Sequence, residues 1–179
     1  MSRKELAMLT EDILTERLVL KSTREEYSPL CLSIWLDEEM GKYLSDPPRE
    51  HATETYMNFA KDIEKDETWY PFVAFSKSNN EFIGTCSIVP MDDPTHWDLG
   101  YCIHKKYWRQ GYATEMIQAL IHFGYAKGGR KFTADIAQEN IASNAVIKKL
   151  GFTVETEGTF TKQGTNMIYN NYTYKLELE

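Results

Sequence analysis

Residues 107–115, with the sequence Tyr-Trp-Arg-Gln-Gly-Tyr-Ala-Thr-Glu, combine residue types that can hold a phosphate group. They lie where a predicted strand ends and a long predicted helix begins. The free N–H groups of the first helical turn and the positive end of the helix dipole therefore converge on one point. Gly111 would let the backbone approach a phosphate closely, and Arg109 could add a charge-assisted hydrogen bond. The segment predicts an anion site, with an ordinary strand-to-helix junction as the alternative.

The charge distribution along the chain favours the anion site. The 179 residues include 20 Lys and Arg and 27 Asp and Glu, which gives a formal net charge of −7. Residues 104–131 nevertheless hold six basic residues and the single acid Glu115, a net charge of +5, whereas the rest of the chain carries −12. An anionic ligand would be attracted to this one region.

The composition and residue spacing argue against several functional classes. A net acidic chain is not suited to broad nonspecific binding of nucleic acid or of an anionic membrane. The three cysteines lack CxxC spacing and the four histidines form no HExxH pair, so no metal site is expected. Neither a Walker-type phosphate loop nor a GxGxxG fingerprint occurs. Because no apolar stretch approaches the ~20 residues of a membrane span and no signal-peptide core follows the N-terminus, we expect a cytoplasmic protein.

Hydrophobic periodicity predicts one α/β domain over residues 13–179, after a polar, flexible tail at residues 1–12. A capping box at Ser22 or Thr23 is expected to open the first helix, and Thr53 to cap the second. The four predicted helices comprise residues 22–36, 53–63, 111–126 and 140–150. The seven predicted strands comprise residues 18–21, 69–76, 81–89, 96–103, 131–137, 152–156 and 172–178.

The connection through the third helix determines part of the sheet topology. The strand before Gly111 and the strand after Gly129 are expected to be parallel neighbours, because such crossovers are right-handed. Helices covering a mixed sheet follow from this order of elements.

Two motifs resemble the GNAT superfamily of N-acetyltransferases. Trp108-Arg109-Gln110-Gly111-Tyr112-Ala113 is similar to the family's acetyl-CoA pyrophosphate loop, Q/R-x-x-G-x-G/A, with Trp108 at the Q/R position. Asn140-Ile141-Ala142-Ser143, followed by Lys149-Leu150-Gly151-Phe152, resembles the N-x-x-S and K-L-G-F segment of the branch of ribosomal-protein N-terminal acetyltransferases. Residues 15–20 also resemble the opening strand of that branch. The resemblance spans about residues 13–178 and implies a GNAT-like domain with a splayed sheet.

The resemblance implies that acetyl-CoA lies between the strand ending at Ile103 and the strand at residues 131–137. Backbone groups of Tyr101 and Ile103 would bind the pantetheine arm, and Asn140 and Ser143 would face the pantetheine and the thioester. Helix capping is the alternative role of Asn140 and Ser143. The implied pyrophosphate ligands are Arg109, Gln110, Gly111, Tyr112, Ala113 and Thr114.

The family mechanism implied is direct attack of an amine on the thioester in a ternary complex. Asp98 lies where many relatives place a carboxylate that draws the proton from the amine, with an ordinary solvated carboxylate as the alternative. Ile147 stands where other branches have a tyrosine acid, so Ser143 could donate a proton or the thiolate could leave unassisted. Cys102 and His104 share a strand face, but two residues of one strand are usually too far apart for the thiol–imidazole pair that an acetyl-cysteine mechanism needs.

We therefore expect an acetyl-CoA-dependent N-acetyltransferase, monomeric or homodimeric, that needs no metal. Its acceptor would be a protein N-terminal α-amine or a small-molecule amine such as an antibiotic or polyamine. Residues 27–67 and 160–169 are expected to determine the acceptor. The alternative from another class is a catalytically silent acyl-CoA-binding or protein-interaction domain of the same fold, in keeping with the missing tyrosine.

Overall fold

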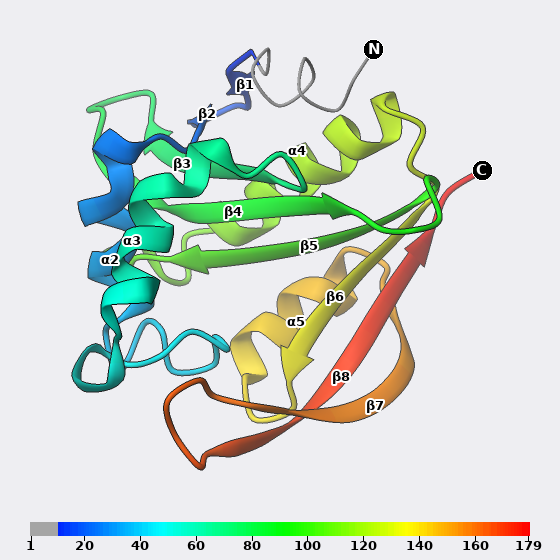
Figure 1. Ribbon diagram of the computed structural model, residues 1–179. Coiled ribbons are helices and arrows are strands. Elements are labelled where there is room, and N and C mark those ends of the chain that lie inside the picture. Colours follow the sequence, from blue (N-terminus) through cyan, green and yellow to red (C-terminus); the bar gives the residue numbers. More distant parts are fainter. Residues whose placement is uncertain (1–10) are drawn as a thin grey trace.

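The computed structural model describes residues 11–179, and within them the strands form one mixed sheet with the order β1-β2-β3-β4-β5-β6-β8-β7 (Figure 1). The strands are β1 (Ile13–Leu14), β2 (Leu18–Ser22), β3 (Tyr70–Ser76), β4 (Phe82–Pro90), β5 (His96–Ile103), β6 (Lys131–Ala137), β7 (Thr153–Thr161) and β8 (Ile168–Glu177). The α-helices of this part of the chain are α2 (Ser28–Trp35), α3 (Glu54–Asp62), α4 (Tyr112–Ala126) and α5 (Ile141–Lys149). None of these helices has the length and apolar character to span a membrane.

The predicted α/β class and mixed sheet are confirmed, with eight strands in residues 11–179 in place of the expected seven. The additional strand is β1, in which Ile13 pairs with Leu20 and Leu14 with Val19. Two residues are too few to show the alternation that identifies a strand in a sequence. Residues 1–10 of the predicted tail lie outside the described residues.

The predicted start of the first helix is wrong. Ser22 belongs to β2 in the ladder with β3, and α2 begins only at Ser28, without a side-chain cap. Pro29 suits the first turn of α2, because a first-turn N–H has no intrahelical partner to lose. Strand pairing therefore overrides the capping box at Ser22 or Thr23. The predicted cap of α3 by Thr53 is confirmed.

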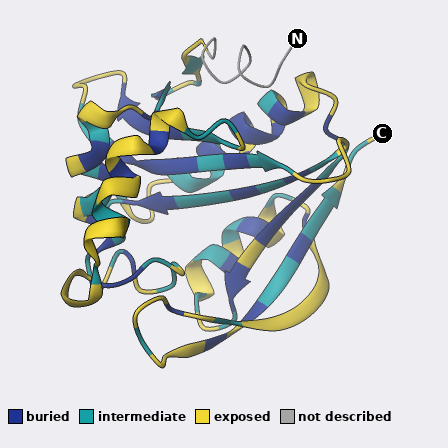
Figure 2. Ribbon diagram, viewed as in Figure 1, coloured by how far each residue is buried: buried dark blue, intermediate teal, exposed yellow. Residues whose placement is uncertain are grey.

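Helices cover both faces of the sheet. Phe72 of β3 belongs to the main core with Met116 of α4 and Ile147 of α5, whereas the next residue, Val73, packs with Cys31 of α2. Since successive strand residues point to opposite faces, α4 and α5 lie on one side and α2 on the other. Figure 2 shows buried positions along the central strands and an exposed β7, which is one of the two edge strands of the described sheet.

The sheet splits between β5 and β6. These strands are parallel neighbours, as predicted, but they pair only from His96–Lys131 to Asp98–Thr133. Residues 99–103 continue to pair with β4, and residues 134–137 with β8, so each half of the sheet stays intact while the halves diverge (Figure 1). The expected splayed sheet is therefore present, and the split widens toward the carboxyl ends of β5 and β6.

The hairpin between β7 and β8 is hydrogen-bonded to the loop that follows α2. Lys162 is buried, and its Nζ donates to the carbonyl oxygens of Gly41 at 2.7 Å and Leu44 at 2.8 Å. The N–H of Gln163 donates to the carbonyl oxygen of Ser45 at 2.9 Å. The loop after α2 is thus fastened to the hairpin through hydrogen bonds that include a buried ammonium group.

Replacing Lys162 with Met tests this fastening. Met retains most of the aliphatic chain but removes the donor, so we expect the free energy of unfolding to fall by about 1–3 kcal/mol. Chemical denaturation measures the change, and Lys148→Met at an exposed position of α5 is the matched control, with an expected change within about 0.5 kcal/mol. Equal stability of the two variants would mean that the Lys162 hydrogen bonds do not hold the loop.

Candidate active site

The predicted phosphate-binding loop leads from β5 into α4. Arg109 and Gly111 both adopt positive φ angles, 62° and 81°, and Gly111 is the N-cap residue of α4. No side-chain hydrogen bond caps α4, whereas Thr53 caps α3 and Asn140 caps α5. The first-turn N–H groups of a 15-residue helix therefore lie open beside the exposed Arg109. This donor set fits a pyrophosphate.

Arg17, just before β2, braces this loop. Its Nε donates to Glu115 Oε2 at 2.7 Å and its Nη1 donates to the carbonyl oxygen of Gln110 at 2.8 Å. Its guanidinium lies 4.2 Å from the centre of the Tyr112 ring. Burial raises the pKa of Glu115, but hydrogen bonds from Thr15 and Arg17 outweigh it and keep the pKa below its ordinary value. The loop conformation thus depends on a residue 98 positions away from Glu115, which sequence analysis did not assign to the site.

Arg17→Ala should weaken binding of coenzyme A, the ligand that the resemblance implies. Without the brace the loop must be ordered on binding, and we expect about a tenfold loss of affinity, equivalent to roughly 1.4 kcal/mol. Isothermal titration calorimetry on the folded variant measures this. Arg24→Ala, at an exposed position of the same segment, serves as the control, and equal affinities of both variants would refute the bracing role.

The backbone of β5 faces the split at alternate residues. Because the N–H of His104 donates to Ile83 of β4, alternation directs the backbone groups of Cys102 toward β4 and those of Tyr101 and Ile103 toward the split. The carbonyl oxygen of Ile103 already accepts from Trp108 Nε1 at 2.7 Å. Tyr101 therefore offers both of its backbone groups to a ligand in the split, whereas Ile103 offers only its N–H.

Two hydroxyl groups lie between β5 and α5. The Tyr101 hydroxyl is buried and has no hydrogen-bond partner of normal geometry among the described residues. Burial raises the pKa of Tyr101 to about 12, and the Ser143 hydroxyl acts in the opposite direction, so we infer that the two side chains face each other. A buried hydroxyl that forms no hydrogen bond of normal geometry, beside an open strand edge, fits a polar ligand such as a pantetheine arm.

The start of α5 is held by asparagine side chains. Asn140 Oδ1 accepts from the N–H of Ser143 at 3.2 Å, so the helix-capping alternative is present in the structure. The buried Asn144 donates to the carbonyl oxygen of Ala137 at 2.9 Å and accepts from the Tyr174 hydroxyl at 2.7 Å. A ligand role for Asn140 and Ser143 stays a prediction. Ile147 is fully buried in the core, which leaves no proton donor at that position.

Asp98 is the last residue of β5 that pairs with β6, so it lies where the split begins. Its Oδ1 accepts from Thr133 Oγ1 at 2.6 Å. Burial raises the pKa of Asp98 to about 6; the Thr133 hydrogen bond opposes this shift and the charge of Asp135 adds to it. A carboxyl group with this pKa exchanges a proton readily near neutral pH, unlike the ordinary solvated carboxylate weighed as the alternative.

Polar groups also gather on the sheet face that α2 covers. Burial raises the pKa of Asp46 while the Tyr56 hydroxyl and Lys162 oppose it, and burial lowers the pKa of Lys162 while Asp46 opposes it. Burial raises the pKa of the Cys102 thiol to about 12, and this thiol donates to the carbonyl oxygen of Met40 at 3.5 Å. A thiol that stays protonated is a poor nucleophile, which argues against the acetyl-cysteine mechanism.

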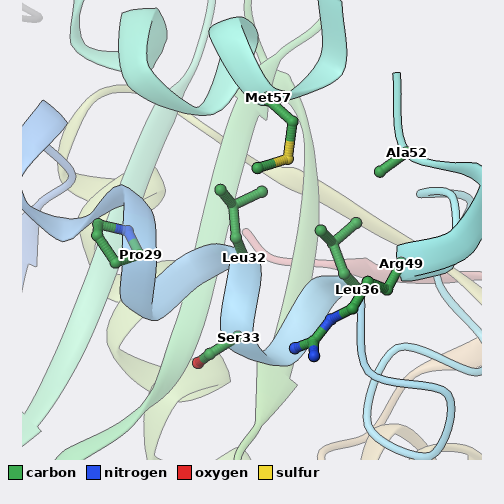
Figure 3. A pocket seen from close by; sticks show the side chains of 7 residues that line it. All are labelled: Pro29, Leu32, Ser33, Leu36, Arg49, Ala52 and Met57. Atoms are coloured by element: carbon green, nitrogen blue, oxygen red, sulfur yellow. The ribbon is translucent and has the colours of Figure 1, made fainter. Parts of the chain in front are cut away.

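A pocket of about 450 Å³ lies elsewhere, between α2, the turn Arg49–His51 and α3. Figure 3 shows the side chains of Leu32, Leu36 and Met57 around it. None of its lining residues belongs to the predicted phosphate-binding loop or to the split between β5 and β6. Within residues 11–179, no group of three or more His, Cys, Asp or Glu side chains is placed to hold a metal ion.

Solved structures share this fold. A GNAT-family acetyltransferase from Bacillus anthracis matches with a TM-score of 0.76 and 22% identity, over 93% of this chain and 98% of that one. The ribosomal L7/L12 α-N-protein acetyltransferase RimL, in complex with coenzyme A, matches with a TM-score of 0.75 and 21% identity, over 94% of this chain and 98% of that one.

The sequence comparisons identify the family. Residues 17–153 match the family model described as an acetyltransferase (GNAT) domain. An uncharacterized N-acetyltransferase, p20, of Bacillus licheniformis is 26% identical over 81% of this chain and 84% of that protein. The chain belongs to the GNAT acetyltransferase family, which confirms the resemblance that its two motifs indicated.

Proposed function

We propose that the protein transfers the acetyl group of acetyl-CoA to a primary amine by direct attack in a ternary complex. The observation that carries this proposal is the uncapped start of α4, with Arg109 and Gly111 at positive φ, next to a split between parallel strands. In open sheets, ligands bind outside the carboxyl ends of parallel strands. The arrangement offers N–H donors for the pyrophosphate and a strand edge for the pantetheine arm.

Bound acetyl-CoA would supply an activated acetyl group as a thioester. Arg109, Gln110 and the first turn of α4 would hold the pyrophosphate, and the backbone of Tyr101 would orient the pantetheine arm. The Ser143 hydroxyl, beside Tyr101, is the candidate donor of a proton to the departing thiolate, directly or through water. Asp98 would take the proton from the acceptor ammonium.

The acceptor that fits best is an amine of moderate basicity. An α-amine has a pKa of roughly 7.8 and a lysine side chain one of about 10.4, a difference of about 2.6 units or roughly 3.5 kcal/mol in the cost of the neutral nucleophile. A base with a pKa of about 6, as at Asp98, lies about two units below the α-amine but more than four below lysine. A protein N-terminus or a low-pKa small-molecule amine is therefore our proposed acceptor. The name of the coenzyme A-bound relative, an α-N-protein acetyltransferase, is consistent with the first.

The direct test combines binding with turnover. Acetyl-CoA should raise the melting temperature in proportion to the logarithm of its concentration well above Kd, because it binds the native state. Thiol release from acetyl-CoA is then followed with N-terminal peptides, polyamines, amino acids and aminoglycosides. Absence of a thermal shift at saturating acetyl-CoA would overturn the proposal, whereas binding without turnover on any acceptor would favour the catalytically silent module.

Asp98→Asn should remove the limb near pH 6 from the pH–rate profile and leave only the limb set by the pKa of the free amine. In the wild type, kcat/KM should fall below about pH 6 as the Asp98 carboxylate is protonated. The Asn variant should be slow at all pH values and follow only the deprotonation of the free amine. Because a raised carboxyl pKa means that the ionised form is destabilised in the folded state, the variant should be at least as heat-stable as the wild type at pH 8. An unchanged acid limb would remove Asp98 from the mechanism.

A further inference from the structure

Three side chains form a hydrogen-bonded row across the closed end of the split. Thr133 Oγ1 lies 2.6 Å from Asp98 Oδ1 and 2.9 Å from His96 Nε2. His96 and Asp98 are two residues apart on β5, so they share a sheet face, and Thr133 is the registered partner of Asp98 on β6. The row occupies the only segment over which β5 and β6 pair in the described chain.

The sheet holds this row rigidly. Thr133 is only 4% exposed, and the neighbouring residues Trp97 and Phe132 are buried in the main core. Strand pairing on both sides of β5 and β6 sets the spacing of the three side chains, whereas a loop would leave it variable. Rigid strands are the elements best suited to hold a reacting group in one orientation.

Proton counting assigns the direction of both hydrogen bonds. A carboxylate can only accept, so the single Thr133 hydroxyl proton is directed to Asp98. The Thr133 oxygen must then accept from His96, which requires a hydrogen on Nε2. Burial lowers the pKa of His96 and the charge of Lys131 adds to this, while Glu155 and Asp93 oppose it. The lowered pKa favours the neutral imidazole, whose Nε2–H donates to Thr133 Oγ1.

The hydrogen-bonded row of His96, Thr133 and Asp98 counteracts two effects that raise the pKa of Asp98 and so favour its protonated form. Burial of its carboxyl group and the negative charge of Asp135, on β6, both favour the protonated form. The Thr133 hydrogen bond favours the ionised form, and donation from His96 polarises the Thr133 hydroxyl and strengthens that bond. Without the row, Asp98 would be a weaker candidate to accept a proton from an amine at neutral pH.

We propose that His96 and Thr133 are positioning residues that keep Asp98 ionised and in one rotamer at the start of the split, ready to deprotonate the acceptor. This inference rests on the proposed function, since it assigns a purpose to the row only if Asp98 is the base. Neither residue belongs to the GNAT motifs found in the sequence.

The test compares replacements that remove the hydrogen-bonding group with replacements that keep it, at Thr133 and at His96. Thr133→Val keeps the shape but removes the hydroxyl, so the acid limb of kcat/KM should move up by about one pH unit, a tenfold loss at low pH that disappears at high pH. Thr133→Ser retains the hydroxyl and should restore the limb to its original position. His96→Leu should shift the limb in the same direction by less, and His96→Gln, which retains a donor, should largely reverse that shift.

The outcomes separate this inference from the proposed function. Loss of the limb near pH 6 in Asp98→Asn, together with an unmoved limb in Thr133→Val, would overturn the positioning role of Thr133 and His96 and leave Asp98 as the base. A uniform loss of activity in Thr133→Val at every pH, not rescued by Ser, would reduce Thr133 to a structural residue and also overturn the inference. Equal thermal shifts with coenzyme A in all variants would show that the cofactor site is intact in each comparison.

Discussion

The end of pairing between β5 and β6 is the constraint on which the rest of the molecule depends. Each strand keeps one partner, β4 or β8, so both halves of the sheet survive the separation. Because the two strands are parallel, their carboxyl ends lie on the same side of the sheet, and the helices that follow them begin there. The split thus brings the N-termini of α4 and α5, distant in sequence, to one open strand edge.

The N-termini of α4 and α5 differ in side-chain capping, and this difference indicates where an anion would bind. Asn140 satisfies the first turn of α5, whereas α4 has no side-chain cap and lies in the segment whose net charge is +5. The positive φ angle of Arg109 is energetically unfavourable for a residue with a side chain. It persists because Arg17 binds both Glu115 and the carbonyl oxygen of Gln110 and so holds the loop in place. Local strain is therefore maintained by a contact between the beginning and the middle of the chain.

The sequence predicted those features that local patterns encode. The parallel neighbours, the α4 segment and the Thr53 cap follow from periodicity and turn residues, and all are present. Features that depend on pairing or on distant charge were missed. Ser22 joins a strand because β3 offers it a ladder, and β1 is too short for a pattern. Arg17 has no local signal, since its partner Glu115 is distant along the chain.

The buried ionisable groups on the face that α2 covers connect the chemistry to the shape of the split. A buried charge is tolerated only where hydrogen bonds replace water. Asp98 on β5 receives its hydrogen bond from Thr133 on β6, and Lys162 on the far hairpin donates to Gly41 and Leu44 after α2. In both cases the stabilising partner lies in the other half of the sheet or in the layer that covers it. The ionisation of these groups therefore depends on how the two halves of the sheet and the loop after α2 are placed relative to one another.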